Sequence, residues 1–437
     1  MTKSLRRLLF SLLIPVIGSL SLQAQPLEAV VAKAIEENPD VLAGIEQLRA
    51  AGFDVRIAKG AFLPTVTAGA DGGTERRERD GFPTTDQNRG SANVEAALPL
   101  FRGFGNQAGL ERADAAHQAT YHRPVAIADD IALRPAPAYL ELLRAERVVE
   151  LSRQNLTDHE ATYDLVKQRS DQGVSDQSDL TQITGRLARA KASLANSLNN
   201  LRDAETTMQQ LAGMRPSGLV APASWSARLP GSRSVLTNQA LEQQVTLLAA
   251  QEDVTAAEAG VTAQRSVIYP QVDLVADGEW RDGVEGFKGR EDEYRVLVRA
   301  RLDLYQGGQN LNRVRQAESR TESARQNLEK VRRQVLANAH ASWDAFELLA
   351  EAGTHLQEYV DATIETSDLY HQQFTVGRRT LLDLLDSQNE LFNAQQVLIR
   401  NQYDLLGAEL RVLASMSELT PALGINLTDR LDEAEGS

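Results

Sequence analysis

Hydrophobic residues follow two different periods along this chain, and each period predicts a different element. From Leu27 to Lys59 the apolar positions recur at helical spacing, and Pro64 ends that run because the residue before a proline disfavours the helical region. Beyond Pro64, apolar and polar residues alternate, which is typical of a strand with two unlike faces. The pattern predicts a helix followed by a strand pair within residues 64–101, with a charged loop at 76–90 between the strands.

A second strand pair is predicted within residues 270–305. Apolar residues occupy every second position there, opposite arginines and an aspartate: Tyr294, Val296, Val298, Ala300, Leu302 and Leu304. Such alternation predicts one face toward water and the other toward lipid or a protein core. Aromatic residues at the strand ends favour lipid, because a girdle of aromatics flanks the apolar band of a membrane sheet: Phe62, Phe101, Tyr269, Trp280 and Tyr305. The other interpretation is an amphipathic sheet packed on a helix.

Very long helical runs follow each strand pair. In the second, a seam of small and apolar residues steps by four and three from Ala317 to Val335, and helical character persists to about Phe374. About 65 residues at ~1.5 Å each predict a rod on the order of 100 Å. Return helices are expected to end near Leu211 and Met416. Each long helix and its return helix therefore form a hairpin.

A glycine marks the tip of each hairpin. Gly173 in QGVSDQSDLT and Gly377 in VGRRTLLDLLDSQ stand where one helix must end and another begin. Glycine readily adopts the left-handed conformation of a helix C-cap. The tips lie 204 residues apart, and the same spacing separates Asp179 from Asp383. The chain is therefore one supersecondary unit written twice, and its function is expected on the paired tips or strands.

Composition divides the chain further. Residues 1–24 carry a charged start, an apolar run and a small residue at the expected cleavage point, which predicts a secretory signal peptide. Repeat 1 is expected over 25–212 and repeat 2 over 237–416. The Pro- and Gly-rich segment 213–236 is expected to be a linker or equatorial insert, and 417–437 a flexible tail.

Three prolines interrupt the long helix of repeat 1: Pro124, Pro135 and Pro137. A proline inside a helix removes a backbone hydrogen bond and clashes with the preceding turn, at a cost of ~3 kcal/mol. A kink or break is therefore expected in this helix, and the second repeat has no proline at the matching positions.

Charge and composition exclude several classes of protein. A net charge of −14 offers no basic footprint for nucleic acid. Cysteine is absent, which removes disulfides, thiolate chemistry and lipid attachment through an N-terminal cysteine. The six histidines show no metal-ligand spacing, and no serine lies in a nucleophile-elbow setting. Neither an enzyme nor a resident cofactor or metal is expected.

The strand count predicts an oligomer. A sheet in lipid must have no open edge, because lipid offers no partner for unpaired backbone groups, and four strands cannot close a barrel. Two chains would supply eight strands, a barrel whose interior is filled by side chains. Three chains would supply twelve strands and leave room for a pore. The sequence therefore favours a homotrimer.

The mature chain resembles the TolC family of outer-membrane channels. Each repeat has the family's order of helix, strand pair, long helix and return helix, and the most specific match is VGRRTLLDLLDSQNELFNAQ at Val376 to Gln395. The resemblance implies a mixed α and β fold: a trimeric transmembrane β-barrel with four strands per chain, continued by a long periplasmic α-helical barrel of coiled-coil hairpins. It also implies a homotrimer in outer-membrane lipid that docks on a periplasmic adaptor and an inner-membrane ABC or RND-type transporter.

The resemblance assigns roles to residues at the tips. Arg379 matches the family's tip arginine, and Ser178 and Asp179 match its partners in the other hairpin. Together they are expected to hold a periplasmic gate closed through hydrogen bonds and ion pairs. Phe374 stands where the best-known member has a tyrosine in that network, so its hydroxyl is missing here. Adaptor hairpins are expected to contact the tips around Gly173 and Gly377.

Two carboxylates near the start of the second return helix, Asp383 and Asp386, are three residues apart and share one helix face. Exposed acids at a helix N-terminus can simply stabilise the helix dipole. Around a three-fold axis they would instead form a cation-attracting ring at a narrow entrance. The resemblance implies the ring.

The expected function is the exit channel of a tripartite efflux or type I secretion system, opened at its periplasmic tip when it docks to its partners. The choice of cargo is expected to belong largely to the inner-membrane partner. The competing hypothesis is a periplasmic coiled-coil scaffold or adaptor without a pore. It would explain the helices and the signal peptide but not the two alternating strand pairs.

Overall fold

A computed structural model describes residues 26–173, 175–213, 218–286 and 289–436, so the expected signal peptide lies outside the described residues. The helices and strands in chain order are α1 (Leu27–Glu36), α2 (Pro39–Gly60), β1 (Thr65–Arg77), β2 (Thr85–Arg102), α3 (Gly105–Ala132), α4 (Pro135–Asp171), α5 (Gln177–Ala212), α6 (Arg233–Gln243), α7 (Val245–Arg265), β3 (Gln271–Asp282), β4 (Arg290–Arg301), α8 (Gln309–Thr375), α9 (Leu381–Ala414), α10 (Leu419–Ala422) and α11 (Thr428–Gly436).

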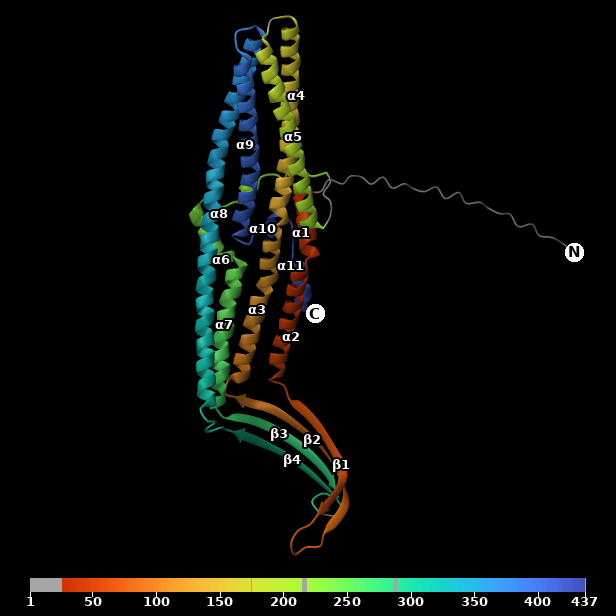
Figure 1. The fold of residues 1–437 in the computed structure, drawn as a ribbon. Helices are drawn as coiled ribbons and strands as arrows, with labels where there is room; N and C mark the ends of the chain where they lie inside the picture. Colours follow the sequence, from red (N-terminus) through yellow and green to blue (C-terminus); the bar gives the residue numbers. More distant parts are fainter. Residues whose placement is uncertain (1–25, 174, 214–217, 287–288, 437) are drawn as a thin grey trace, which may run out of the picture.

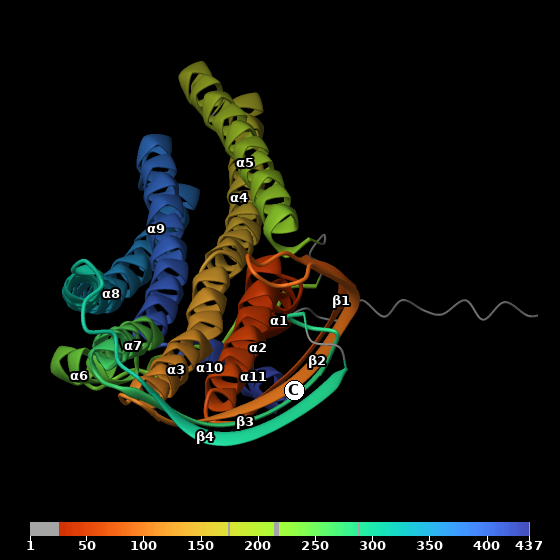
Figure 2. The ribbon, with the colours of Figure 1, turned by 90° about the horizontal axis from the view of Figure 1, so that it is seen from below.

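The molecule is a long helical rod with a curved sheet at one end (Figure 1). The hairpins α4/α5 and α8/α9 form the opposite end, and α2, α3 and α7 connect the sheet to the middle of the rod. Helix α8 alone runs unbroken for 67 residues, which at ~1.5 Å per residue is about 100 Å. Seen from below, the sheet forms an arc along one side of the helices (Figure 2). The predicted rod is therefore confirmed.

The four strands form one antiparallel sheet in the order β1-β2-β3-β4. Strands β1 and β2 pair from Thr65 opposite Ala97 to Arg77 opposite Thr85. The predicted bounds of the charged loop, 76–90, were therefore wrong. Strand β1 continues to Arg77 and β2 begins at Thr85, so the loop is only 78–84. Cross-strand polar contacts stabilise this extension, since Arg89 donates to the Asp71 carboxylate at 2.8 Å.

The helix of repeat 1 is interrupted at one of the expected places. Helix α3 ends at Ala132 and α4 begins at Pro135, and Pro137 lies in the first turn of α4. A proline at the first helical position costs little, because its missing N–H has no helical acceptor there. Pro124 instead lies inside α3. A Cβ added at Gly44 on α2 would lie 3.3 Å from Cγ of Pro124, so the two helices pack closely at this point.

The C-terminal segment is folded, and the prediction of a flexible tail at 417–437 was wrong for its described part. Helix α11 packs on α2. Apolar residues of this segment are buried in the main core at a spacing of about one helical turn: Leu419, Leu423, Leu427, Leu431 and Ala434. Their burial removes apolar surface from water, which stabilises the segment although it lies at the end of the chain.

The described part of the 213–236 insert lies against the middle of the rod. The Tyr139 hydroxyl donates to the carbonyl of Val220 and accepts from its N–H, both at 2.9 Å. The carboxylate of Glu409, which is 2% exposed, accepts from the Ser224 hydroxyl at 2.8 Å and from the Trp225 N–H at 2.7 Å. These bonds attach the insert to α4 and α9.

Across the described ranges, none of the helices combines the length and the apolar content needed to cross a membrane.

Candidate functional site at the hairpin tips

The two predicted tips lie side by side at the end of the rod opposite the sheet (Figure 1). Gly173 has a φ of 73° and Gly377 a φ of 76°. Residues other than glycine rarely adopt this left-handed backbone conformation. The N–H of Gly377 donates to the carbonyl of Phe374 at 3.0 Å, and that of Gly173 to the carbonyl of Ser170 at 2.9 Å. Each glycine therefore ends one helix and turns the chain toward the next.

Helix α9 begins with a capping box at the second tip. The Thr380 N–H and hydroxyl donate to Oδ2 of Asp383 at 3.3 and 2.9 Å, and the Asp383 N–H donates to Oγ1 of Thr380 at 3.2 Å. The hydrogen bonds from Thr380 lower the pKa of Asp383, and the positive charge of Arg379 adds to this effect. Asp383 is therefore held in its ionised form at the start of α9.

Arg379 is engaged inside its own hairpin. Its Nε donates to Oε1 of Gln373 at 3.0 Å, and its guanidinium carbon lies 4.1 Å from the centroid of the Tyr370 ring. Its Nη1 is 3.8 Å from Oδ2 of Asp383. These three contacts fix the guanidinium over the turn between α8 and α9.

The resemblance gave Ser178 and Asp179 as the partners of Arg379 in the other hairpin. Within one chain, the structure does not bring them into contact with Arg379. Both partners lie in the first turn of α5, and their side chains make no hydrogen bond or ion pair with any residue the structure describes. The physical reason is that Arg379 already has the three partners of its own hairpin.

Phe374 is part of an apolar joint between the hairpins. It is 4% exposed and packs in a cluster with residues of α4, α5 and α9: Val166, Ile183, Leu381, Leu384 and Leu385. The guanidinium carbon of Arg169 lies 4.7 Å from the centroid of its ring, which is a cation–π distance. Phe374 therefore joins the hairpins by apolar packing, where a tyrosine could use its hydroxyl.

Two arginines that the sequence reasoning missed connect the hairpins. Arg169 near the end of α4 donates to the carbonyls of Phe374 and Thr375 at 3.2 and 2.7 Å, both at the C-terminal end of α8. Arg186 on α5 donates to Oδ1 of Asp386 on α9 at 2.9 Å. Neither arginine has an acidic residue three or four positions away on its own helix, and each follows a buried apolar residue, Val166 or Ile183, by three positions. That combination is a sequence signal for an arginine that pairs across helices.

The two carboxylates of the predicted entrance ring have different surroundings. The side chain of Asp383 is 39% exposed and that of Asp386 is 60% exposed. Asp383 caps its helix, whereas Asp386 forms the ion pair with Arg186 on the other hairpin. Both remain accessible to water, and the Arg186 pair offsets part of the negative charge.

Within the described ranges, no group of three or more His, Asp or Glu side chains is placed to hold a metal ion. The tip therefore consists of arginine contacts, helix caps and an apolar joint.

Comparison with known proteins identifies the family. The model of the family described as outer membrane efflux protein matches residues 30–214 and 236–417, which include both repeats. The outer membrane efflux protein BepC of Brucella suis is 24% identical over 399 residues, covering 91% of this chain and 86% of that protein. The outer membrane protein TolC of Vibrio cholerae is 24% identical over 423 residues, covering 92% and 94%.

Solved structures share the fold. The outer-membrane channel OprN aligns with a TM-score of 0.74 at 19% identity, covering 90% of each chain. The Campylobacter jejuni outer membrane channel CmeC aligns with a TM-score of 0.74 at 13% identity, covering 94% of this chain and 89% of that one. The family model, the curated relatives and the fold agree, and they point away from catalysis. The chain therefore belongs to the outer membrane efflux protein family, the TolC family of outer-membrane channels.

Proposed function

We propose that three copies of this chain form the exit channel of a tripartite efflux or type I secretion system. The observation that carries the proposal is a two-faced sheet with two unpaired edges at the end of a long helical rod. Strands β1 and β4 are the edges of the described sheet. A sheet in lipid must pair its edges, so β4 of one subunit pairs with β1 of the next in the proposed trimer.

One face of the sheet is apolar and exposed in the single chain. Val296 is 75% exposed, Val298 63% and Val66 68%. The strand register places Leu274 opposite Val298 and Ala276 opposite Val296, so these side chains share one face. An exposed apolar face is costly in water and favourable against lipid tails. This face is the proposed lipid contact.

The opposite face carries ion pairs. Asp277 lies opposite Arg295 in the register and accepts from its Nε at 3.0 Å. Arg102 pairs with Asp273 at 2.7 Å. Charged pairs of this kind suit a water-filled interior and not a hydrocarbon layer. This face lines the proposed pore.

Aromatic side chains lie at both ends of the sheet, as a membrane sheet requires. Near the helices, the ring centroids of Phe101 and Phe104 are 5.5 Å apart, and those of Phe104 and Tyr269 are 6.3 Å apart. At the far end, Nε1 of Trp280 donates to the Tyr294 hydroxyl at 3.1 Å. The proposed membrane span lies between these two groups.

The tip is the proposed gate. Within each subunit, Arg169, the Arg186–Asp386 pair and the apolar joint around Phe374 hold the two hairpins together. Between subunits, Arg379 is proposed to contact Ser178 and Asp179. Partly exposed ion pairs contribute only about 0–1 kcal/mol each, so a docking partner can release them.

The partners of the gate follow from the same proposal. A periplasmic adaptor contacts the tips around Gly173 and Gly377, and an inner-membrane ABC or RND-type transporter supplies the cargo. Asp383 and Asp386 from three subunits form the cation-attracting entrance ring. The protein is proposed to act as a conduit and not as an enzyme.

The membrane partition of the protein distinguishes this proposal from the scaffold alternative. A periplasmic scaffold would not expose an apolar face such as that of β4 to water. The experiment is fractionation of cells that express the full chain, followed by electrophoresis of heated and unheated samples. The expected result is recovery in the outer-membrane fraction with migration that changes on heating. Recovery in the soluble periplasmic fraction would contradict the proposal.

A further inference from the structure

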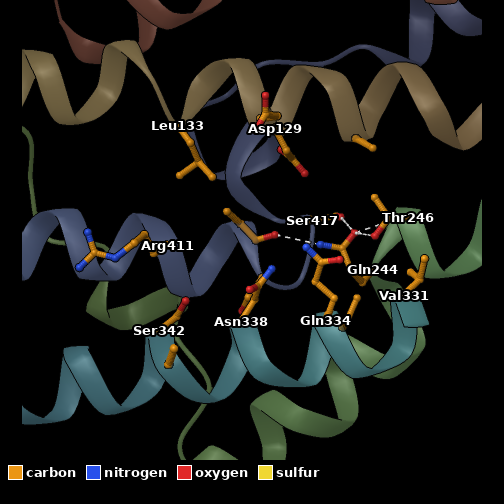
Figure 3. Close-up of a pocket in the computed structure, with 16 residues that line it drawn as sticks. Asp129, Leu133, Gln244, Thr246, Val331, Gln334, Asn338, Ser342, Arg411 and Ser417 are labelled. Atoms are coloured by element: carbon orange, nitrogen blue, oxygen red, sulfur yellow. Dashed lines mark hydrogen bonds between the residues drawn. The ribbon is translucent and has the colours of Figure 1, made fainter. Parts of the chain in front are cut away.

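A cavity of about 610 Å³ lies in the middle of the rod, away from the tips. It is open to solvent and is lined by residues at the end of α3, the start of α7, the central part of α8 and the end of α9. In Figure 3, Asp129 on α3 and Leu133, just after its end, lie across the cavity from Gln334, Asn338 and Ser342 on α8. The cavity is adjacent to the interruption between α3 and α4, where the chain departs from the pattern of the second repeat.

The cavity combines apolar walls with one buried carboxylate. Leu133, Val331 and Val335 provide apolar surface for the body of a small molecule. Asp129 is only 6% exposed, and aspartate is rarely buried without a partner. Polar side chains from α3, α7, α8 and α9 also line the cavity, and a mainly apolar surface with polar groups placed on it is typical of small-molecule sites.

The two oxygens of Asp129 differ. Oδ1 accepts from the N–H and the hydroxyl of Thr420 at 3.2 and 3.0 Å. Oδ2 is buried and has no hydrogen-bond partner among the described residues. A buried acceptor left without a donor costs free energy, more so when it is charged. The orphaned oxygen is the group that a ligand in the cavity would satisfy.

The neighbouring polar groups do not supply a hydrogen-bond donor to Oδ2 of Asp129. Oε1 of Gln244 accepts from the Ser417 hydroxyl at 2.8 Å and from the Thr246 N–H at 3.1 Å, and its Nε2 donates to the carbonyl of Ala414 at 3.2 Å. Arg134, which lies between α3 and α4, pairs at 2.8 Å with Asp130. Arg411 on α9 also lines the cavity, at the end away from Gln244 (Figure 3). Asp129 itself forms no ion pair with a described residue.

We propose that this cavity binds a small organic cation, a protonated amine with an apolar body, whose N–H group donates to Oδ2 of Asp129. The amine supplies both the missing donor and the missing positive charge, and the apolar body lies between Leu133 and Val335. Burial raises the pKa of Asp129 to about 6, opposed by the hydrogen bonds from Thr420. The carboxylate is therefore mostly ionised at neutral pH, as binding of a cation requires. The site is independent of the proposed gate.

The test is ligand-observed fluorine NMR with purified full chain in lipid nanodiscs at pH 7.5. The probe is 4-fluorobenzylamine, and its neutral counterpart is 4-fluorobenzyl alcohol. The amine is expected to bind at least about tenfold more tightly than the alcohol, because a hydrogen bond to a buried charge contributes more than one to a neutral group. Equal binding of the two probes, or no binding of the amine, overturns the proposal.

Two variants locate the site. Asp129→Asn keeps an acceptor for Thr420 and removes the charge, so affinity for the amine is expected to fall about tenfold or more. Asp344→Asn is the matched control, since its half-exposed side chain pairs with Arg233 and does not line the cavity, and it is expected to bind as the unmodified chain does. If Asp129→Asn fails to fold, Ala341→Leu fills the cavity from its exposed rim and is also expected to abolish binding. Unchanged binding by Asp129→Asn or Ala341→Leu contradicts the assignment.

Discussion

Nη2 of Arg186 on α5 lies 2.9 Å from Oδ1 of Asp386 on α9, so a charged hydrogen bond joins the two hairpins of one subunit near their tips. These residues are 200 positions apart in the sequence. Asp386 is also one of the two acids of the proposed entrance ring. One contact therefore connects the closed arrangement of the hairpins to the charge at the entrance.

Loss of the arginine bridges is expected to open the tip. Arg186→Ala combined with Arg169→Ala removes the donors that join α5 to α9 and α4 to α8. Sucrose permeation into proteoliposomes, measured by swelling, is expected to rise about two- to tenfold, because three subunits each lose weak contacts. Arg189→Ala is the control, since this exposed arginine lies on the same helix. Equal swelling by the double variant and the control would contradict the gate assignment.

The proposed contact between subunits is tested by exchanging charges. Arg379→Asp and Asp179→Arg are each expected to increase swelling, because each places like charges together across the subunit boundary. The double variant restores an attractive pair and is expected to return swelling toward that of the unmodified chain. If the double variant leaks as much as the two single variants added together, the residues do not interact.

The entrance ring is expected to bind multivalent cations. Asp383→Asn with Asp386→Asn removes six carboxylates from a trimer, so block by hexaamminecobalt(III) is expected to weaken about tenfold or more. Arg186→Ala is expected to strengthen block, because it removes the positive partner of Asp386. Asp404→Asn, at the other end of α9, is the control and is expected to leave block unchanged. Unchanged block by hexaamminecobalt(III) in the double variant would contradict the ring assignment.

The two faces of β4 are expected to respond differently to the same substitution. Val298 lies on the apolar face and Leu297 on the face with the ion pairs. Val298→Lys places a charge in lipid and is expected to cost about 2–4 kcal/mol near the bilayer midplane. Leu297→Lys reaches water in the pore and is expected to cost less. Urea titrations of folding into vesicles measure both variants, and equal destabilisation would argue against the lipid assignment.

Burial of Asp129 predicts a pH dependence of stability. Its pKa is raised from 3.8 to about 6, so the folded state binds a proton more tightly than the unfolded state between these values. The stabilisation by the neutral form is therefore complete below pH 3.8 and is lost as pH rises through about 6, a change of about 3 kcal/mol.

Asp129→Asn removes this dependence. The Tm of the unmodified chain and of Asp129→Asn is measured by circular dichroism from pH 4 to pH 7. As pH rises, the Tm of the unmodified chain is expected to fall relative to that of Asp129→Asn. Asp130→Asn, whose side chain is exposed and paired with Arg134, controls for loss of a carboxylate. Parallel Tm curves for the unmodified chain and Asp129→Asn would show that Asp129 does not titrate in this range.

Local periodicity was sufficient to predict the main elements. The alternation at Tyr294 to Val298 and the glycines at 173 and 377 are signals between near neighbours, and the structure has the strand β4 and both tips at these places. The polar ends of β1 and β2 were missed because their residues are paired across strands, as Arg89 is with Asp71. Such pairing compensates for the absence of apolar residues and leaves no local signal.

Contacts between distant segments could not be predicted from one sequence. The Arg186–Asp386 pair and the orphaned oxygen of Asp129 depend on how separate helices pack. The C-terminal segment could have been recognised, because Leu419, Leu423, Leu427 and Leu431 recur every four residues. Its place at the end of the chain, the proline at 421 and its acidic end made it resemble a solvated tail.

The most direct test of the central claim is single-channel conductance of the purified protein in planar bilayers, with hexaamminecobalt(III) added to the side that the tips face. A closed channel with the entrance ring is expected to give a small, cation-selective conductance that the trivalent cation blocks, and Arg186→Ala with Arg169→Ala a larger conductance. Absence of conductance from folded, membrane-inserted protein, in the unmodified chain and in the double variant alike, would contradict the channel and support a scaffold.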